Sequence, residues 1–278
     1  MLTNSEQANS SWIDHYRKHG YVVLEKILPL ELVDAHVAAC EEIQRRHGIY
    51  QKFPWRKDPL ENEKAFGEEL LALDDNHEPT KSLRNDPTLR WYLNALFQEE
   101  AVLQYGSTSL WERGREPHSD TVMLFRDPPD KVCRAWCALE DIHPDCGMFY
   151  VIPGTHNNER IRIYDEVLGS NPEIFKLLRS PLPNDSESAF LENRAIWKVV
   201  CQKTASLTKG LPRVPFSINK GDVVLFDPNV IHGTMPASNP SLTRKAIVTE
   251  WQTRSVRNYS YSEYFGSQHD KRQLSLAN

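Results

Sequence analysis

A change of pattern near Glu100 constrains the fold of this chain more than any other feature. Before that point apolar residues recur mainly at helical spacing. After it the chain runs in short stretches of β-branched and aromatic residues, separated by Gly, Pro, Asn and Asp, which is typical of an antiparallel sandwich or barrel. The expected strands lie near residues 101–106, 120–126, 132–140, 148–152, 222–226, 229–235 and 243–252. The predicted fold class is therefore mostly β with flanking helices.

The N-terminal part is expected to be mostly helical. A short amphipathic helix starts near Ser10 and stops at Gly20, and residues 21–24 then read as a strand. Pro29 lies at the first turn of a second helix, and residues 86–98 carry a further apolar stripe.

With 278 residues, the chain is expected to form a single domain, residues 1–278, with a sizeable core. A helical part over about 10–98 packs on a β core over about 100–256, and 257–278 form a C-terminal tail. Within the core, an insertion of mixed helix and loop over about 157–219 is interpreted as a lid over the substrate.

Composition limits the partners and the compartment. Lys+Arg 33 against Asp+Glu 38 gives 33 − 38 = −5, which offers no general attraction for nucleic acid or for a membrane surface. The five cysteines are odd in number and include one close pair, Cys133 and Cys137, so free thiols are expected. We also expect no signal peptide and no membrane span, and hence a cytoplasmic protein.

The strongest chemical signal is the pair His118 and Asp120, followed much later by His232. Residues two apart on a strand point to the same face, and a histidine from a distant strand completes three corners of an octahedron. This is the ligand set of non-heme Fe(II) oxygenases, and it leaves three coordination positions open. For His232 alone, a hydrogen-bonded core histidine is the alternative.

Spacing alone does not identify the metal ligands, because ten histidines and thirty-eight acidic residues give His-x-Asp/Glu about once by chance. A second copy occurs at His143 and Asp145. There Pro144 cannot donate to a sheet and a turn signal follows, so this copy reads as a loop. The stretch after His118 has strand character, and we assign the metal there.

The predicted last strand of the core carries an arginine, Arg244. Arg244 shares a strand face with Ala246 and Val248, where a buried guanidinium requires an anion, and its fork matches a carboxylate. Thr234, two residues beyond His232, could assist the same carboxylate. The alternative is a surface arginine on an edge strand.

Together these residues resemble the phytanoyl-CoA dioxygenase family of Fe(II)/2-oxoglutarate oxygenases. The resemblance covers most of the chain except the insertion and both ends. It is carried by Gly20–Leu24, Pro117-His118-Ser119-Asp120, Trp136–Asp141, Gly147, Pro153-Gly154-Thr155-His156, Lys220-Gly221-Asp222, His232-Gly233 and Arg244.

The resemblance implies a double-stranded β-helix, or cupin-like jelly roll, with His118, Asp120 and His232 as ligands of Fe(II). It further implies that 2-oxoglutarate and O2 are cosubstrates, that 2-oxoglutarate is decarboxylated to succinate and CO2, and that an unactivated C–H bond of the substrate is hydroxylated.

The same resemblance assigns the cosubstrate pocket. Arg244 with Thr234 would bind the far carboxylate of 2-oxoglutarate, Trp136 would line the pocket, and Gln104 would touch the cosubstrate. For Trp136, a core aromatic is the alternative.

The substrate is expected to be a small metabolite or natural-product intermediate. Arg134 faces the same way as Trp136, and Arg113, Arg115 and Arg126 flank the metal motif, which indicates a substrate with an anionic group. The alternative is that these arginines pair with acidic residues of the chain.

Three other functions fit the same residues. The chain could bind a metal or an organic acid without turnover, since a fold does not fix a function. It could be a zinc hydrolase, because two histidines and an aspartate also hold zinc, although Arg244 would then have no role. Its oxidation could also end in desaturation or cyclisation instead of hydroxylation.

Overall fold

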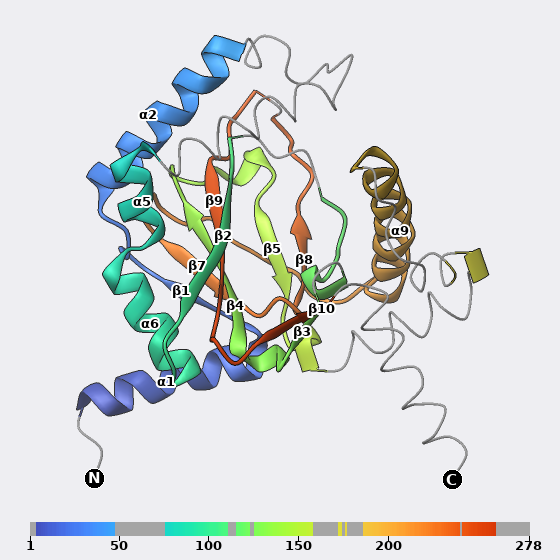
Figure 1. Ribbon diagram of the computed structural model, residues 1–278, viewed down its shortest axis with the longest axis horizontal. Helices are drawn as coiled ribbons and strands as arrows, with labels where there is room; N and C mark the ends of the chain where they lie inside the picture. Colours follow the sequence, from blue (N-terminus) through green and yellow to red (C-terminus); the bar gives the residue numbers. More distant parts are fainter. Residues whose placement is uncertain are drawn as a thin grey trace.

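The architecture is an antiparallel β core with helices on its outside (Figure 1). The structure is a computed structural model. It describes residues 4–47, 76–110, 115–122, 125–157, 172–173, 176, 186–239 and 241–259.

Helices α2 (Leu30–His47), α5 (Glu78–Arg84) and α6 (Pro87–Phe97) lie on one side of the strands, and α1 (Asn4–His19) runs along the bottom of the view (Figure 1). As expected, α1 ends at Gly20, whose φ of +82° is in the left-handed region that favours glycine. A Cβ there would also lie 2.7 Å from Nδ1 of His156, so no larger residue fits. Asp86 caps α6, since its carboxylate accepts the N–H groups of Thr88 and Leu89. Helix α5 was not singled out from the sequence.

The larger sheet has five strands in the order β1-β7-β4-β9-β2, all antiparallel. They are β1 (Tyr21–Leu24), β2 (Val102–Ser109), β4 (Val132–Ala138), β7 (Val223–Phe226) and β9 (Ala246–Gln252). Val223 and Leu225 pack in the cluster shared with the helices, whereas Val224 and Phe226 pack in the interior between the sheets. Both faces of β7 are buried, which explains its unbroken apolar sequence.

The smaller sheet has the order β6-β5-β8, with β5 (Phe149–Ile152), β6 (Val214–Pro215) and β8 (Ile231–Thr234). Its side chains meet those of the larger sheet in one apolar cluster that includes Trp136, Phe149 and Phe226. Two facing antiparallel sheets form the predicted jelly-roll core.

The predicted strand over 120–126 is wrong in its first half. Residues Asp120–Val122 form a 3-10 turn, and the strand β3 covers only Phe125–Asp127. The N–H of Asp120 is bonded to the carbonyl of Pro228 at 3.0 Å, and not to that of Val230, which would continue the pairing of His118 with His232. β3 pairs with β10 (Arg257–Tyr259), so the expected tail begins with a strand.

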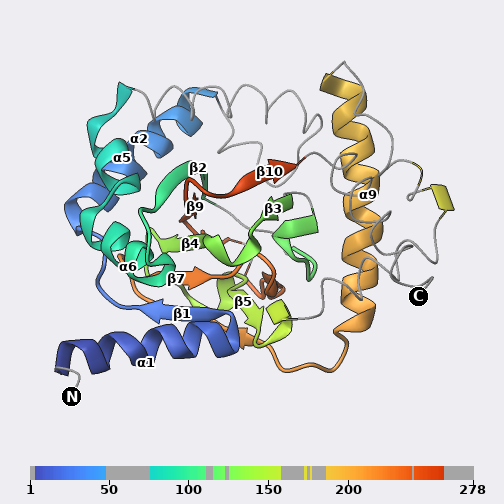
Figure 2. The same cartoon turned by 60° about the horizontal axis from the view of Figure 1, so that its bottom comes forward.

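The described part of the insertion contains a long helix. Helix α9 (Ser186–Leu207) stands across the strands from α2, α5 and α6 (Figures 1 and 2). It buries Ile196, Val200 and Cys201. The remaining short 3-10 turns are η2 (Pro129–Lys131), η3 (Pro144–Cys146) and η4 (Thr155–Asn157). Much of the predicted lid, and the tail after residue 259, lie outside the described residues.

All five cysteines are described and buried, and none is in a disulfide, which agrees with the expectation of free thiols. Among the described helices, none combines the length and the apolar character needed to cross a bilayer.

Candidate metal centre

The three residues singled out for a metal lie together between the two sheets. One ligand atom of each, from His118, Asp120 and His232, falls within 4.8 Å of the other two. Asp120 Oδ1 is 3.8 Å from Nε2 of His118, and Oδ2 is 3.4 Å from Nε2 of His232. The side chains of His118, Asp120 and His232 are 2%, 11% and 7% exposed, so the cluster is largely withdrawn from water.

Main-chain pairing brings the two histidines side by side. His118 and His232 form an isolated antiparallel bridge, in which each N–H donates to the other residue's carbonyl at 2.9 Å. Residues directly opposite in such a pair project their side chains to one face. Asp120 reaches the same place from the turn that follows, although the sequence expectation was an extended strand.

Each histidine is fixed in the tautomer that a metal needs. Nδ1 of His118 donates to the carbonyl of Glu116 at 2.7 Å, and Nδ1 of His232 donates to the carbonyl of Val230 at 2.9 Å. Because a carbonyl only accepts, the proton of each neutral ring is on Nδ1, and the Nε2 lone pairs face Asp120. Two neutral imidazoles and one carboxylate fit a divalent transition metal such as Fe(II).

The charge states agree with that arrangement. Burial lowers the pKa of His118 to about 3, and His232 acts in the same direction. Burial alone would raise the pKa of the Asp120 carboxyl, but Arg134 and His232 hold this pKa well below its usual range. At neutral pH the ring of His118 is therefore uncharged, and Asp120 carries a negative charge.

Aromatic rings enclose the two imidazoles. The centroids of Phe226 and Phe149 are 4.9 and 5.6 Å from that of His232, and Trp197 of α9 meets His118 edge-on at 4.6 Å. Trp197 is half-buried. The insertion thus supplies a wall of the metal centre that sequence reasoning did not identify.

The residues predicted to clamp the cosubstrate lie in the same interior. Arg244 is 3% exposed, and its guanidinium carbon lies 5.6 Å from the centroid of Trp136, which stacks on Phe149. Trp136 is thus a core aromatic that also contacts Arg244. Thr234 is buried on β8, and its hydroxyl oxygen accepts the backbone N–H of Arg115. The hydroxyl hydrogen of Thr234 still has a direction in which to donate.

Arg134 and Gln104 have different surroundings from those expected. Arg134 lies beside the triad, but Glu250 and Asp120 already balance its charge, at 2.9 and 3.1 Å. Gln104 is exposed at a register shift of β2 and donates to the carbonyl of Val102 at 3.3 Å. Among the described residues, no hydrogen bond or ion pair joins Gln104 to the triad.

The second His-x-Asp copy is outside the site. The side chains of His143 and Asp145 are 57% and 55% exposed, and they lie 3.8 Å apart around the short turn η3. Of the flanking arginines, Arg126 pairs with Glu250 at 2.9 Å, whereas Arg115 is largely exposed. Arg113 lies outside the described residues.

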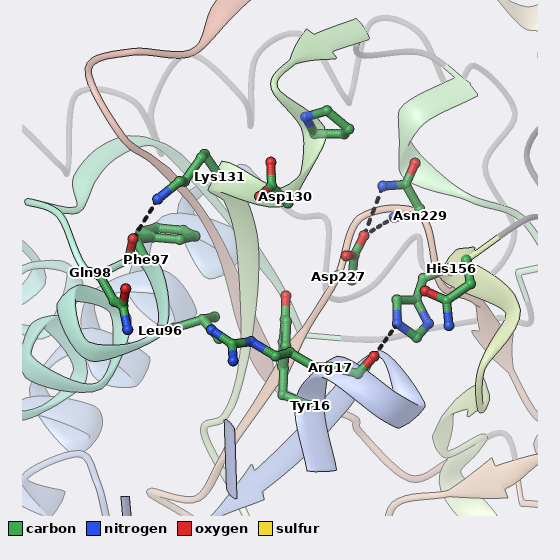
Figure 3. Close-up of a pocket in the computed structure, with 12 residues that line it drawn as sticks. Tyr16, Arg17, Leu96, Phe97, Gln98, Asp130, Lys131, His156, Asp227 and Asn229 are labelled. Atoms are coloured by element: carbon green, nitrogen blue, oxygen red, sulfur yellow. Dashed lines mark hydrogen bonds between the residues drawn. The ribbon is translucent and has the colours of Figure 1, made fainter. Parts of the chain in front are cut away.

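A separate pocket of about 350 Å³ lies beyond the turn that joins β7 to β8 (Figure 3). Its lining includes Tyr16 and Arg17 at the end of α1, Lys131, and Asp227 and Asn229 from that turn. None of the triad residues lines it. The carbonyl of Pro228, between Asp227 and Asn229, accepts the N–H of Asp120, so the turn separates the pocket from the metal centre.

Comparison with known proteins identifies relatives of this chain. The profile of the family described as phytanoyl-CoA dioxygenase (PhyH) matches residues 16–246, which include the triad and Arg244. Phytanoyl-CoA dioxygenase domain-containing protein 1 of Mus musculus is 25% identical over 116 residues, which are 42% of this chain and 32% of that protein. Phytanoyl-CoA dioxygenase 1 of Oryza sativa subsp. japonica is 28% identical over 150 residues, 51% of this chain and 42% of that protein. The matched part thus spans less than half the length of either relative.

Solved structures share the fold. SnoK, a non-heme α-ketoglutarate dependent carbocyclase from nogalamycin biosynthesis, gives a TM-score of 0.61 at 20% identity, covering 92% of this chain and 88% of its own. The epimerase SnoN, in complex with Fe3+, α-ketoglutarate and nogalamycin RO, gives 0.58 at 17% identity with coverages of 92% and 88%. At these identities the likeness concerns the fold.

Proposed function

This chain belongs to the phytanoyl-CoA dioxygenase family, and from that membership we propose that it is an Fe(II)- and 2-oxoglutarate-dependent dioxygenase that hydroxylates a small molecule. The observation that carries the proposal is the buried cluster of His118, Asp120 and His232, with both Nε2 atoms turned toward the carboxylate. When bound there, iron with 2-oxoglutarate and O2 would supply an oxidant, while succinate and CO2 are released.

The protein's own residues have defined tasks in this proposal. His118 and His232 bind the metal through Nε2, because their Nδ1 atoms are already bonded to main-chain carbonyls. Asp120 contributes the negative charge that offsets part of the metal's charge. The surrounding rings of Phe149, Phe226 and Trp197 exclude water from the reacting atoms.

Arg244 would bind the far carboxylate of 2-oxoglutarate, with Thr234 donating a hydrogen bond from its hydroxyl. The support is that Arg244 is buried on the same interior cluster that surrounds His232, through Trp136 and Phe149. A buried guanidinium gains most from a carboxylate that accepts two parallel hydrogen bonds.

The substrate would enter beside α9. Trp197 presents a half-buried ring next to His118, which suits an apolar or planar part of a small molecule. The insertion that carries Trp197 would act as the lid. Two solved proteins of the same fold are named for ring closure and epimerisation, so the oxidation could also end in those products.

The test is formation of succinate from 2-oxoglutarate by the purified protein with Fe(II), O2 and a metabolite extract. We expect turnover in the wild type, and background levels in His118→Ala, Asp120→Ala and His232→Ala. His143→Ala is the matched control, since it removes the histidine of the exposed copy and should leave turnover unchanged. Equal turnover in Asp120→Ala and the wild type would refute the assignment. Loss of a compound from the extract that persists with Zn(II) and without O2, with no succinate formed, would favour a hydrolase. Metal binding without any turnover would favour a binding protein.

A further inference from the structure

Four buried side chains of alternating charge form a continuous row of ion pairs, and Asp120 is its last member. Arg126 Nη2 lies 2.9 Å from Oε1 of Glu250, and Oε2 of the same carboxylate lies 2.9 Å from Nη2 of Arg134. Nε of Arg134 lies 3.1 Å from Oδ2 of Asp120. The side chains of both arginines and of Asp120 are 11% exposed, and that of Glu250 is 1% exposed. The order is therefore cation, anion, cation, anion, in a region with little water.

The register of the sheet fixes Arg134 in this position. Arg134 on β4 is paired with Glu250 on β9, and Glu250 is paired on its other side with Tyr105 on β2. The hydroxyl of Tyr105 contacts Nη2 of Arg134, and the guanidinium carbon lies 5.3 Å from the centroid of the Tyr105 ring. Neighbours on two strands thus hold the guanidinium, and its Nε reaches Asp120.

This geometry argues against the prediction that Arg134 contacts the substrate. Two cations, Arg126 and Arg134, face two anions, Glu250 and Asp120, so the group is neutral within the protein. A substrate anion at Arg134 would have to displace a carboxylate of the chain, and one of those two carboxylates is a proposed metal ligand.

Asp120 itself depends on an external contact for its direction. It is the first residue of a 3-10 turn, and its Oδ2 is buried without an aligned hydrogen-bond donor among the described residues. The 3.1 Å contact with Arg134 is therefore an ion pair whose angle does not suit a hydrogen bond. Contacts of this kind, outside the metal's own ligands, set the direction and the charge of those ligands.

We propose that Arg134 is a positioning residue for the metal: its ion pair turns the Asp120 carboxylate toward His118 and His232, and Glu250 offsets its positive charge so that a divalent ion is still attracted. The inference rests on the proposed metal site at the triad. It assigns the arginine to the metal rather than to the substrate.

The test compares two single variants with the same net charge, each of which keeps Glu250. Arg134→Gln removes the cation beside Asp120, whereas the matched control Arg126→Gln keeps it and leaves Glu250 to offset it. Titration of the metal-free proteins with Mn(II) should show binding about tenfold or more weaker in the first variant than in the control. The visible spectrum of bound Co(II), which reports the ligand set, should change in the first variant alone. Equal Mn(II) affinities in the two variants would overturn the proposal.

A single substitution provides a second measurement that retains every charge. Arg134→Lys replaces the fork with a point charge that cannot reach Glu250 and Asp120 together, so Mn(II) should again bind more weakly than to Arg126→Lys. Similar affinities in that pair would also contradict the inference. If the wild type binds no Mn(II), or if Asp120→Ala binds it equally well, the metal site itself is wrong, and that outcome is distinct from the loss of the Arg134 role alone.

Discussion

The carboxylate of Asp222 bonds two loops to each other, and its removal should lower the free energy of unfolding by a predictable amount. Asp222 is 3% exposed. Its Oδ1 accepts the N–H of Lys26 and its Oδ2 accepts the N–H of Asn219, both at 2.8 Å. Lys26 has a φ of 55°, a conformation that a residue other than glycine adopts only when its surroundings hold it. The bonds thus join the end of β1 to the start of β7.

The expected loss for Asp222→Ala follows from these two bonds. A hydrogen bond to a charged group contributes roughly 1.5–3 kcal/mol, so two of them contribute roughly 3–6 kcal/mol. Both bonds are only partly buried, so water replaces part of each, and the lower end applies. We expect the free energy of unfolding to fall by about 3 kcal/mol.

Urea unfolding of the metal-free protein measures this loss, and Asp141→Ala is the matched control. Asp141 accepts one backbone N–H, that of Lys220 at 2.9 Å, but it is exposed. Its removal should cost less than about 1 kcal/mol. Equal losses in the two variants would refute the argument that burial of the Asp222 carboxylate decides the size of the effect.

Substitutions at three other positions test separate parts of the molecule. Burial lowers the pKa of His36 from 6.5 to about 4, so between these pH values the unfolded chain binds a proton that the folded protein does not. The free energy of unfolding should therefore fall by about 3 kcal/mol as the pH drops from 6.5 to 4. In urea unfolding, His36→Gln should flatten that part of the pH profile. Asp86→Ala removes the cap of α6 and should lower the free energy of unfolding by about 1 kcal/mol, whereas Asp86→Ser should restore most of it. Trp197→Ala removes the ring that contacts His118 and should raise the ratio of succinate formed to oxidised substrate formed. An unchanged ratio would mean that the substrate does not bind beside Trp197.

The sequence was most informative where a residue's role follows from local periodicity. Short runs of β-branched and aromatic residues predicted the strands β4 and β7, and the position of Gly20 predicted the end of α1. The pair His118 and Asp120 was assigned over the second copy because that copy contains Pro144 and precedes a turn signal, and the structure places the second copy outside the site.

Features set by long-range contacts could not be read in the same way. Asp120 begins a 3-10 turn in which its N–H is bonded to a carbonyl more than a hundred residues away, that of Pro228. Glu250 sits in an apolar strand, and only the register of three strands reveals that it faces Arg134. The sequence shows only that an acidic residue interrupts the apolar strand between Thr249 and Trp251, which indicates that a buried cation lies nearby. Trp197 had no such signal, because its contact with His118 depends on where α9 packs.

One segment, from Pro228 to His232, fixes the backbone positions of His118 and Asp120 and the ring of His232 through main-chain carbonyls. Pro228 accepts the N–H of Asp120, Val230 accepts Nδ1–H of the His232 ring, and the backbone of His232 pairs with that of His118. Because these acceptors belong to the backbone, most side-chain substitutions in the segment leave them in place. The backbone of the triad is therefore in place before a metal binds. The direction and the charge of the Asp120 side chain remain to be satisfied, because a buried carboxylate beside two imidazoles requires a cation. Arg134 meets that requirement in the metal-free protein, and a divalent ion would meet it more fully.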